Sequence, residues 1–366
     1  MVATYETKTD YKVVGKTPIR HDALEKVTGR AVYGGDVKAP GLIWGDVVRS
    51  PHSHARIKSI DTSDALKLEG VFAVLTHDDF PIAEERELES GEDVVNLKRD
   101  QANVMADDKV HYKGHVVAAV AAVDRNTAEE AASRIKVEYD VLQNVSDVDS
   151  AMSDDAPIIL ENLVGDHLGE DVPNTNIAKI FRYEFGNLDD AFNNSDLVVE
   201  RTVTMSMIHQ GYIEPHNATA IWAEDGQITV WSSTQGSFGV RSQTAGMVGV
   251  AESKVKVNYV EIGGGFGGKT KVYLAPIAAL LSKKSGGRPV KLVMDRTSVF
   301  EATGPAPGGK IRMKIGVNKD GKITAADTDI MFESGGYPGS AVSAAANCIF
   351  ACYDLPVSCM TGYDIL

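Results

Sequence analysis

The 366-residue sequence predicts an α+β fold, and three observations favour this class. Apolar or alternating stretches of strand length dominate the chain, such as the almost continuously apolar residues 114–123. Helical patterns are fewer and do not alternate strictly with strands, as they would in a parallel βαβ sheet. Two pairs of strand-like stretches meet at Asp-Gly dipeptides, 225–226 and 320–321, which are typical of antiparallel hairpins.

The first expected unit spans residues 16–145 and follows an N-terminal arm of residues 1–15. A helix is expected near residues 126–134, because the acids in its first turn suit the positive end of the helix dipole. Short apolar or alternating stretches predict its strands, at 31–37, 42–50, 71–76, 114–123 and 135–142.

The polar, acidic segment 146–186 is expected to be an extended connector with no regular structure. The second unit, residues 187–366, is expected to begin with a short helix at 187–196. Its other elements are expected at 197–207, 218–235, 254–262, 289–295 and 310–334 as strands, and at 271–284 as a helix. The last strand-like stretches have no obvious partners. We therefore expect part of a larger fold, either a split subunit or a truncated chain.

Composition excludes several classes of function. The formal net charge of -14 repels phosphate backbones, so no nucleic-acid partner is expected. No apolar run reaches the ~18 residues of a membrane-spanning helix, and the first residues lack the apolar segment of a secretory signal. A soluble, cytoplasmic protein without a membrane partner is expected.

The three cysteines, Cys348, Cys352 and Cys359, form no C-x-x-C pair. Iron–sulfur clusters usually need four thiolates, and zinc sites favour closely spaced pairs. We expect reduced, mostly buried thiols and no iron–sulfur cluster held by this chain.

Residues 262–270, I-G-G-G-F-G-G-K-T, match both G-x-G-x-x-G and the Walker A pattern G-x-x-x-x-G-K-T. A nucleotide-binding P-loop is disfavoured, because antiparallel hairpins rather than further βα units are expected after Asp295. More generally, consecutive glycines let backbone N–H groups approach an anionic group closely. A tight strand-to-helix turn that buries Phe266 remains an alternative.

The stretch H-Q-G-Y-I-E-P-H contains His209, Glu214 and His216, a set of side chains that can bind zinc. Their spacing does not fit H-E-x-x-H on a helix, and Pro215 interrupts it. We interpret these residues mainly as structural, with a place on the substrate side open to Glu214.

Beyond the glycine run, several blocks resemble the molybdopterin-binding large subunit of the xanthine dehydrogenase, aldehyde oxidase and carbon monoxide dehydrogenase family. D-A-L-E-K-V-T-G-R-A-V-Y-G-G-D-V and V-V-R-S-P-H-S-H-A-R-I-K-S-I-D resemble its α/β hammerhead domain. G-Y-I-E-P-H-N-A-T-A-I-W, V-W-S-S-T-Q-G-S-F-G-V and V-E-I-G-G-G-F-G-G-K resemble its molybdenum-binding domain. The resemblance implies a hammerhead domain at 16–145 and the first part of a mixed-sheet cofactor domain at 187–366.

The resemblance also assigns roles to individual residues. It implies that the Gln235 amide hydrogen-bonds an oxygen ligand of molybdenum, beside a loop that places backbone and an aromatic wall near the metal. The implied cofactor-binding residues are Gln235, Gly236, Gly264, Gly265, Phe266 and Gly267, with Gln235 and Phe266 around molybdenum and Thr270 and Glu214 lining the substrate. The family's catalytic glutamate belongs to a C-terminal half that is absent here, so no catalytic residue is expected in this chain.

The family resemblance further implies the cofactors and partners. Molybdopterin, possibly as the cytosine dinucleotide, would carry molybdenum, while 2Fe-2S clusters and FAD reside on partner chains. A second molybdopterin-binding fragment or subunit, an iron–sulfur subunit and an FAD-binding subunit are expected.

The substrate class remains open between aldehydes, aromatic or N-heterocyclic compounds and carbon monoxide. Thr270 stands where purine-oxidising members carry a glutamate, and no arginine lies near Ser343–Ala346, which makes a purine doubtful. A P-loop nucleotide-binding protein using Gly263–Thr270, and a non-catalytic scaffold subunit, are the alternatives.

Overall fold

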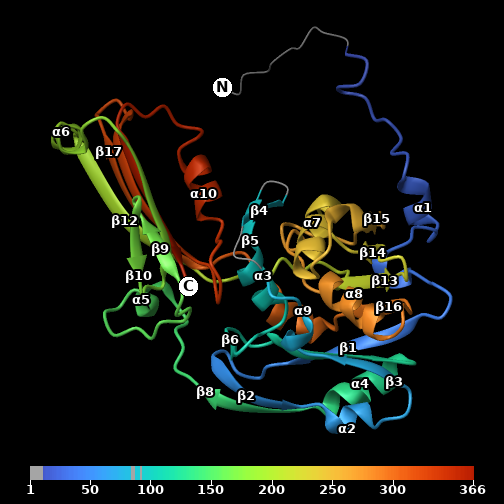
Figure 1. Ribbon diagram of the computed structural model, residues 1–366. Coiled ribbons are helices and arrows are strands. Elements are labelled where there is room, and N and C mark those ends of the chain that lie inside the picture. The colour runs from blue at the N-terminus through green and yellow to red at the C-terminus, as the bar shows by residue number, and fades with distance from the viewer. Residues whose placement is uncertain (1–10, 84–86, 91–92) are drawn as a thin grey trace.

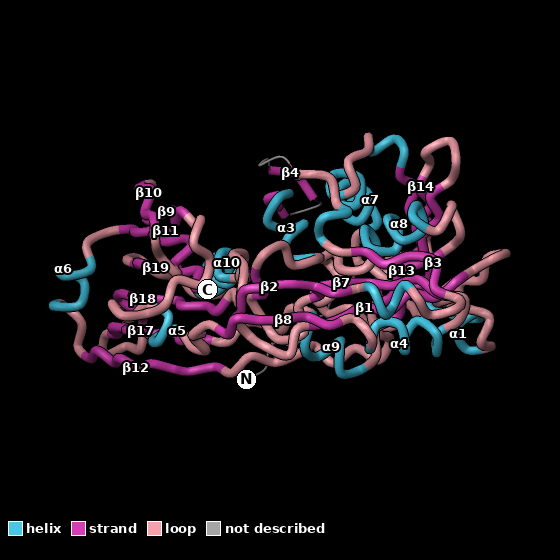
Figure 2. The backbone as a smooth tube through the Cα atoms, turned by 60° about the horizontal axis from the view of Figure 1, so that its bottom comes forward, coloured by secondary structure: helices cyan, strands magenta, loops and turns pink. Residues whose placement is uncertain are grey.

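The computed structural model describes residues 11–83, 87–90 and 93–366, so residues 1–10 of the expected N-terminal arm lie outside the described part. Within it, two seven-stranded sheets lie toward opposite ends of the molecule (Figures 1 and 2). The helices are α1 (Ala23–Val27), α2 (Ser63–Leu66), α3 (Leu97–Val104), α4 (Arg125–Ser133), α5 (Val148–Ala151), α6 (Leu188–Asn193), α7 (Ser237–Met247), α8 (Ala275–Lys284), α9 (Arg296–Ala302) and α10 (Val342–Ile349).

The first large sheet combines strands from both predicted units. Its order is β15 (Val255–Asn258), β14 (Ile228–Ser232), β13 (Asn217–Trp222), β16 (Val290–Val293), β1 (Ile43–Arg49), β7 (Val116–Ala122) and β3 (Val71–Leu75). The two contributions meet where β1 pairs in parallel with β16, at Ile43 opposite Val290. The two units therefore share one sheet.

Both faces of this sheet are covered, which explains the continuously apolar run in β7. Ala119 and Ala121 face a core that includes α8, whereas Ala118, Val120 and Ala122 face the alanines of α4. All seven residues of β7 are buried. Burial on both faces removes the alternation expected of a strand with one solvated face.

The second large sheet lies at the other end (Figure 2). Its order is β10 (Glu170–Pro173), β9 (Val164–His167), β11 (Ile177–Phe185), β19 (Ser358–Ile365), β18 (Ile323–Glu333), β17 (Gly309–Val317) and β12 (Leu197–Met205). The smaller sheets are β6 (Lys109–Val110), β2 (Ala55–Asp61) and β8 (Lys136–Val141), and β4 (Glu87–Ser90) with β5 (Asp93–Asn96).

Three expectations about the elements are corrected. Residues 31–37 form a 3-10 turn at Gly34–Asp36 instead of a strand, and Gly34 lies so close to Asn217 that a Cβ would overlap the asparagine side chain. The segment 146–186 is no unstructured connector, since it contains α5 and three strands. The C-terminal stretch has partners after all, because β19 pairs with β11 and β18.

The missed strands have a physical explanation. In β11, Phe181, Tyr183 and Phe185 alternate with charged Arg182 and Glu184, a strand pattern that the surrounding acidic residues mask in composition. Pro173 ends β10, which is the edge strand of the sheet, where a proline breaks no ladder hydrogen bond.

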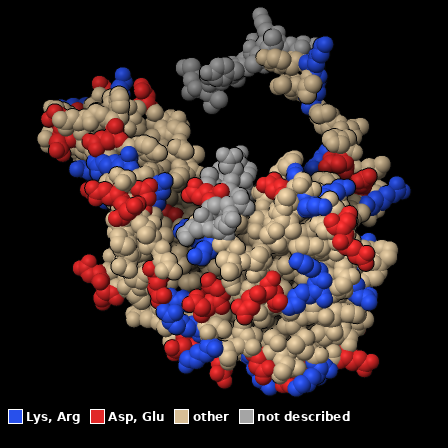
Figure 3. Space-filling view, viewed as in Figure 1, with Lys and Arg blue, Asp and Glu red and all other residues tan. Residues whose placement is uncertain are grey.

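None of the helices in the described residues is long and apolar enough to cross a bilayer. On the face shown in Figure 3, basic side chains are interspersed with acidic ones rather than gathered into one patch.

Candidate functional site

The glycine run forms an irregular loop between β15 and α8. Gly264 and Gly267 adopt φ values of +94° and +89°, a region that favours glycine. Phe266 also has a positive φ, +52°, and its side chain is 74% exposed. The alternative in which Phe266 is buried in a core is therefore wrong. An exposed aromatic side chain on a strained backbone is more typical of a ligand-binding site than of a simple turn.

Gln235 is held against this loop by its side-chain oxygen. The Gln235 Oε1 atom accepts hydrogen bonds from the backbone N–H groups of Gly267 (3.0 Å) and Lys269 (3.2 Å). Its own backbone N–H donates to the Lys269 carbonyl at 2.9 Å. Because both side-chain partners are donors, the oxygen must face the loop, and the NH₂ group faces away from those two N–H groups.

The glycines permit this close approach. A Cβ at Gly265 would lie 2.7 Å from Gln235 Cδ, and one at Gly268 would lie 2.7 Å from the ring of Tyr212. Gly236, beside Gln235, is the N-cap of α7 and provides no side chain to cap that helix. The predicted residues from two distant segments therefore meet in one place.

Hydrogen-bond donors remain available at this meeting point. Among the described residues, the N–H groups of Gly264, Gly265 and Phe266 have no hydrogen-bond acceptor. The Gln235 NH₂ group likewise has no acceptor in the described part of the chain. Such a set of donors suits an anionic or oxygen-rich ligand.

Beneath the loop lies a buried ion pair that the sequence patterns did not reveal. Lys269 is fully buried, and its Nζ lies 2.8 Å from Glu214 Oε2. The same oxygen accepts from the Gly263 N–H at 2.7 Å, and Glu214 Oε1 accepts from Asn217 at 3.2 Å. The Lys269 ammonium also lies 4.8 Å from the centre of the Tyr212 ring. Burial lowers the pKa of Lys269, which the Glu214 carboxylate opposes.

This ion pair changes the interpretation of two expected residues. Glu214 bonds through both carboxylate oxygens to groups within the chain, so it anchors the loop from below. A substrate-lining role for Glu214 remains a prediction. Thr270 is exposed, and its hydroxyl donates to the Gly267 carbonyl at 3.1 Å. A substrate-lining role for Thr270 remains a prediction.

The P-loop alternative is not favoured. Lys269, which would have to reach nucleotide phosphates, is buried against Glu214. The following helix begins at Ala275, several residues after the position that a P-loop requires. The residues after Asp295 include the antiparallel β17–β18 hairpin that the sequence predicts.

The histidines of H-Q-G-Y-I-E-P-H belong to a hydrogen-bonded chain. His216 Nε2 lies 2.8 Å from Tyr212 Oη, and both Tyr212 Oη (3.1 Å) and His209 Nε2 (2.9 Å) contact Thr303 Oγ1. Burial lowers the pKa of His216 to about 3, so the ring is neutral at pH 7. Within the described ranges, no group of three His, Cys, Asp or Glu side chains is arranged to hold a metal ion.

Tyr212 is a structural residue of the site that no sequence motif indicated, and Arg296 holds the backbone of this residue in place. Arg296 donates to the backbone carbonyls of Tyr212 (2.9 Å) and Ile213 (2.5 Å), which fixes the segment that carries Glu214. The lysine that follows the glycine run could have indicated the ion pair with Glu214 from the sequence, because a buried ammonium requires an acidic partner.

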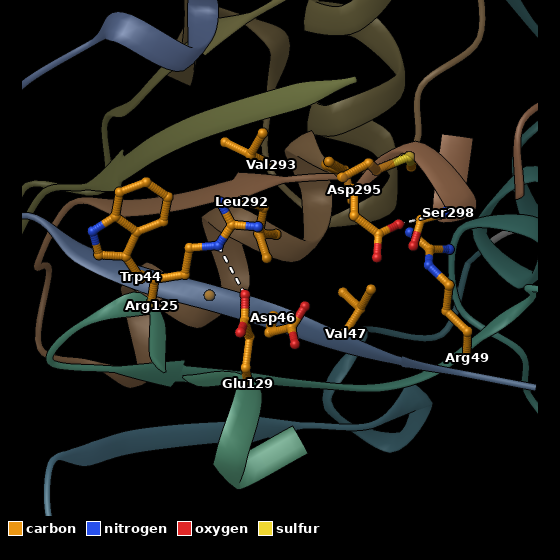
Figure 4. A pocket seen from close by; sticks show the side chains of 13 residues that line it. Trp44, Asp46, Val47, Arg49, Arg125, Glu129, Leu292, Val293, Asp295 and Ser298 are labelled. Atoms are coloured by element: carbon orange, nitrogen blue, oxygen red, sulfur yellow. Dashed lines mark hydrogen bonds and ion pairs between the residues drawn. The ribbon is translucent and has the colours of Figure 1, made fainter. Parts of the chain in front are cut away.

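One cavity of the described residues lies away from the glycine loop. It measures about 100 Å³ and lies between β1, α4 and the start of α9 (Figure 4). Burial raises the pKa of Asp46 and lowers that of Arg49 on its wall. None of the predicted cofactor residues lines it.

The thiols differ from expectation. Cys348 and Cys352 are exposed, and only Cys359 is buried.

Comparison with known proteins decides the family. Residues 168–365 match the family model described as molybdopterin cofactor-binding domain, and residues 28–143 match that of the aldehyde oxidase and xanthine dehydrogenase a/b hammerhead domain. The chain belongs to the molybdopterin-binding large subunits of this family. The fold class is thereby confirmed, including the hammerhead domain and the cofactor domain that follows it.

Individual relatives within the family differ in length. The chain is 32% identical over 328 residues to the nicotinate dehydrogenase large molybdopterin subunit of Eubacterium barkeri, covering 90% of this chain and 72% of the relative. It is 33% identical to the carbon monoxide dehydrogenase large chain of Afipia carboxidovorans, covering 93% of this chain but 42% of the relative. The solved structure of reconstituted CO dehydrogenase from Oligotropha carboxidovorans superposes with a TM-score of 0.82 at 29% identity, covering 96% of this chain and 44% of that one.

The site residues of this large-subunit chain fit a molybdenum cofactor. The outward NH₂ group of Gln235 and the three unpaired loop N–H groups are donors, and a molybdenum cofactor would offer acceptor oxygens on its metal and on the phosphate of its pterin. Gln235, Gly236 and the loop from Gly264 to Gly267 would hold the cofactor. Phe266 would form its aromatic wall.

Proposed function

We propose that this chain provides one cofactor-facing part of a molybdenum hydroxylase. When bound, the molybdenum cofactor supplies the oxidation of substrate with oxygen derived from water. The chain's own residues bind and orient it. A single observation carries the proposal, namely the Gln235 amide, whose oxygen is fixed by two loop N–H groups so that its NH₂ group is free to donate to the cofactor.

The proposal extends to parts of the enzyme outside these 366 residues. More than half the length of the carbon monoxide dehydrogenase large chain has no counterpart here. We place the catalytic glutamate in that remaining part, on a second molybdopterin-binding fragment or subunit. Electrons pass to 2Fe-2S and FAD subunits, and the complex is cytoplasmic.

The substrate and the form of the cofactor belong to the proposal as well. An aldehyde, an aromatic or N-heterocyclic compound, or carbon monoxide is oxidised, with Thr270 on the substrate side. The cofactor is molybdopterin, as the cytosine dinucleotide. A purine is disfavoured, because Thr270 supplies no carboxylate to a purine ring.

The test is molybdenum analysis and turnover of the native complex carrying Gln235→Ala or Gln235→Glu. The glutamate variant keeps acceptor oxygens for the two loop N–H groups but loses the NH₂ donor. We expect both variants to lose roughly 10–100-fold in metal retention or activity, as is common for residues that orient a metal's ligands. Gln227→Ala, in the exposed β13–β14 turn, is the matched control and should behave as wild type.

Two outcomes would contradict the proposal. A complete wild-type complex without molybdenum would favour the scaffold alternative. Tight ATP or GTP binding that Lys269→Ala abolishes would favour the P-loop alternative instead.

A further inference from the structure

The glycine loop is attached to the rest of the chain on both sides of its free donors. The N–H group of Gly263 donates to Glu214 Oε2 at 2.7 Å. The N–H group of Gly267 donates to Gln235 Oε1 at 3.0 Å. The three N–H groups left without an acceptor among the described residues belong to the short span 264–266 between these attachments. The direction in which they face therefore depends on where that span begins and ends.

A third attachment comes from the N-terminal part of the chain. Glu261 lies just ahead of Gly263, with only Ile262 between them. The Glu261 N–H group donates to the Val32 carbonyl at 2.8 Å, and Tyr33 pairs with Glu261 in an isolated parallel bridge. A displacement of Glu261 is therefore passed along the backbone to the first residue that holds the loop.

Helix α1 adds an ion pair to this attachment. Lys26 Nζ lies 2.7 Å from Glu261 Oε2, and the Glu261 side chain is only 10% exposed. The other carboxylate oxygen, Oε1, accepts from the Tyr259 hydroxyl at 2.8 Å. The Lys26 ammonium and the Tyr259 hydroxyl hold the pKa of Glu261 below its usual value. Because both carboxylate oxygens have partners, the Glu261 side chain is fixed in one orientation.

Lys26 is itself held in place. Its ammonium also lies 2.6 Å from Asp22 Oδ2, at the start of the same helix. Asp22 in turn accepts from Arg20 Nη2 at 2.8 Å. Lys26 therefore bridges two carboxylates, one at the start of its own helix and one at the base of the glycine loop.

Packing of a core does not explain this arrangement. Helix α1 has no buried residue, so it contributes little apolar burial. The side chains of Lys26 and Asp22 are each 26% exposed, and ion pairs with this access to solvent add little to the free energy of unfolding. The matched family models begin at residues 28 and 168, so α1 lies outside both. A role in orienting the loop accounts for a contact that contributes little to folding.

We propose that Lys26 is a positioning residue for the cofactor: by holding Glu261, it fixes where the span 264–266 begins and so aims the three free N–H groups. This inference rests on the proposed function. Without the ion pair, the backbone contacts to Val32 and Tyr33 alone would hold Glu261 in place. The loop would then sample more orientations, and fewer of them would present all three donors to one ligand.

Three variants of the native complex test this role. Lys26→Met keeps most of the side-chain volume and removes the charge. Lys26→Arg retains the charge and should behave as wild type. Lys67→Met is the matched control, because it removes an ammonium from an exposed pair with Asp64 (3.1 Å) at the end of α2, in the hammerhead domain.

The first readout is hydrogen exchange in complexes purified from cells grown without molybdate, so that no molybdenum is bound. The N–H groups of Glu261 and Gly263 are followed, since both have acceptors in the structure. In Lys26→Met we expect both to exchange roughly two- to fivefold faster, which is the change that loss of a partly exposed ion pair typically allows. Tm should stay within about 2 °C of wild type in all three variants.

The second readout is the rate at which molybdenum leaves the metal-loaded complex during dialysis. Lys26→Met should lose molybdenum roughly two- to fivefold faster than wild type, because its loop donors are less well aimed. Lys26→Arg and Lys67→Met should match wild type.

Several results would overturn the inference. Unchanged exchange at Glu261 and Gly263 in Lys26→Met would exclude a hold on the loop, and unchanged molybdenum loss would exclude an effect on the cofactor. Equally fast exchange in Lys67→Met would show a general loosening of the fold. Fast exchange in Lys26→Arg would exclude the charge as the cause. A wild-type complex without molybdenum would contradict the proposed function instead, and exchange is measured without the metal, so the two failures remain distinguishable.

Discussion

Replacing Lys269 with methionine tests the buried ion pair beneath the glycine loop. The ammonium is fully buried at 2.8 Å from Glu214, whose side chain is 10% exposed. Methionine keeps most of the volume but leaves the carboxylate without its counter-charge. Removing one partner of a buried pair costs about 3–5 kcal/mol, so Lys269→Met should destabilise the chain by that order.

The matched control is an exposed pair of the same length. Arg125 and Glu129 also lie 2.8 Å apart, but their side chains are 53% and 51% exposed. Arg125→Met should therefore cost less than about 1 kcal/mol. Thermal unfolding measures both. For a chain of this size we expect Tm to fall on the order of 5–10 °C for Lys269→Met and by about 2 °C or less for the control.

A double variant separates the pair from simple packing. Glu214→Gln removes the charge that Lys269→Met leaves unpaired, so the double variant should be less destabilised than the sum of the single effects by about 0.5–3 kcal/mol. A Tm loss for Lys269→Met no larger than that of Arg125→Met would refute the reasoning. Strict additivity in the double variant would refute it as well.

Two further predictions concern the loop and the pH dependence of stability. Gly265→Ala should lower molybdenum retention at least roughly tenfold, because the added Cβ would displace the Gln235 amide. In Gly267→Ala the added Cβ meets no atom within 4 Å, so this variant should lose only about 1–2 kcal/mol of stability through backbone strain. Metal analysis and Tm of both variants check this. Stability should fall as pH is lowered from about 6.5 toward 3, because the unfolded chain binds a proton on His216 that the folded chain, with a pKa of about 3, does not. The slope is ~1.4 kcal/mol per pH unit for this group. His216→Asn should flatten it in urea titrations, and an unchanged slope would contradict the assignment.

The sequence predicted those elements that depend only on a few neighbouring residues, such as hairpin turns and helix starts. Asp225-Gly226 and Asp320-Gly321 specify hairpins by turn chemistry alone, and both hairpins are present. The helix near residues 126–134 forms as α4, with Asp124 accepting from the Thr127 N–H at its start. Such features need only a few neighbouring residues, so the sequence carries them completely.

Long-range pairings could not be derived in the same way. The Lys269–Glu214 pair joins residues 55 positions apart, and in isolation Lys269 reads as part of a Walker motif. Likewise, β19 acquires partners only because β11 and β18 are already in place. Only the family resemblance linked Gln235 to the glycine loop. The spacing of these residues in the sequence gives no reason to expect a hydrogen bond from the Gly267 N–H to Gln235 Oε1.

The shared first sheet has a consequence for how the chain folds. The edge of β1 finds its partner β16 only after almost 250 further residues, since Ile43 pairs with Val290. Contacts of such long sequence separation form slowly, because a large loop must close before they gain any free energy. During synthesis the hammerhead residues emerge first, with the β16-facing edge of β1 unpaired and apolar side chains such as Ile43 uncovered. The chain is therefore most open to aggregation and to chaperone binding in the interval before β16 leaves the ribosome.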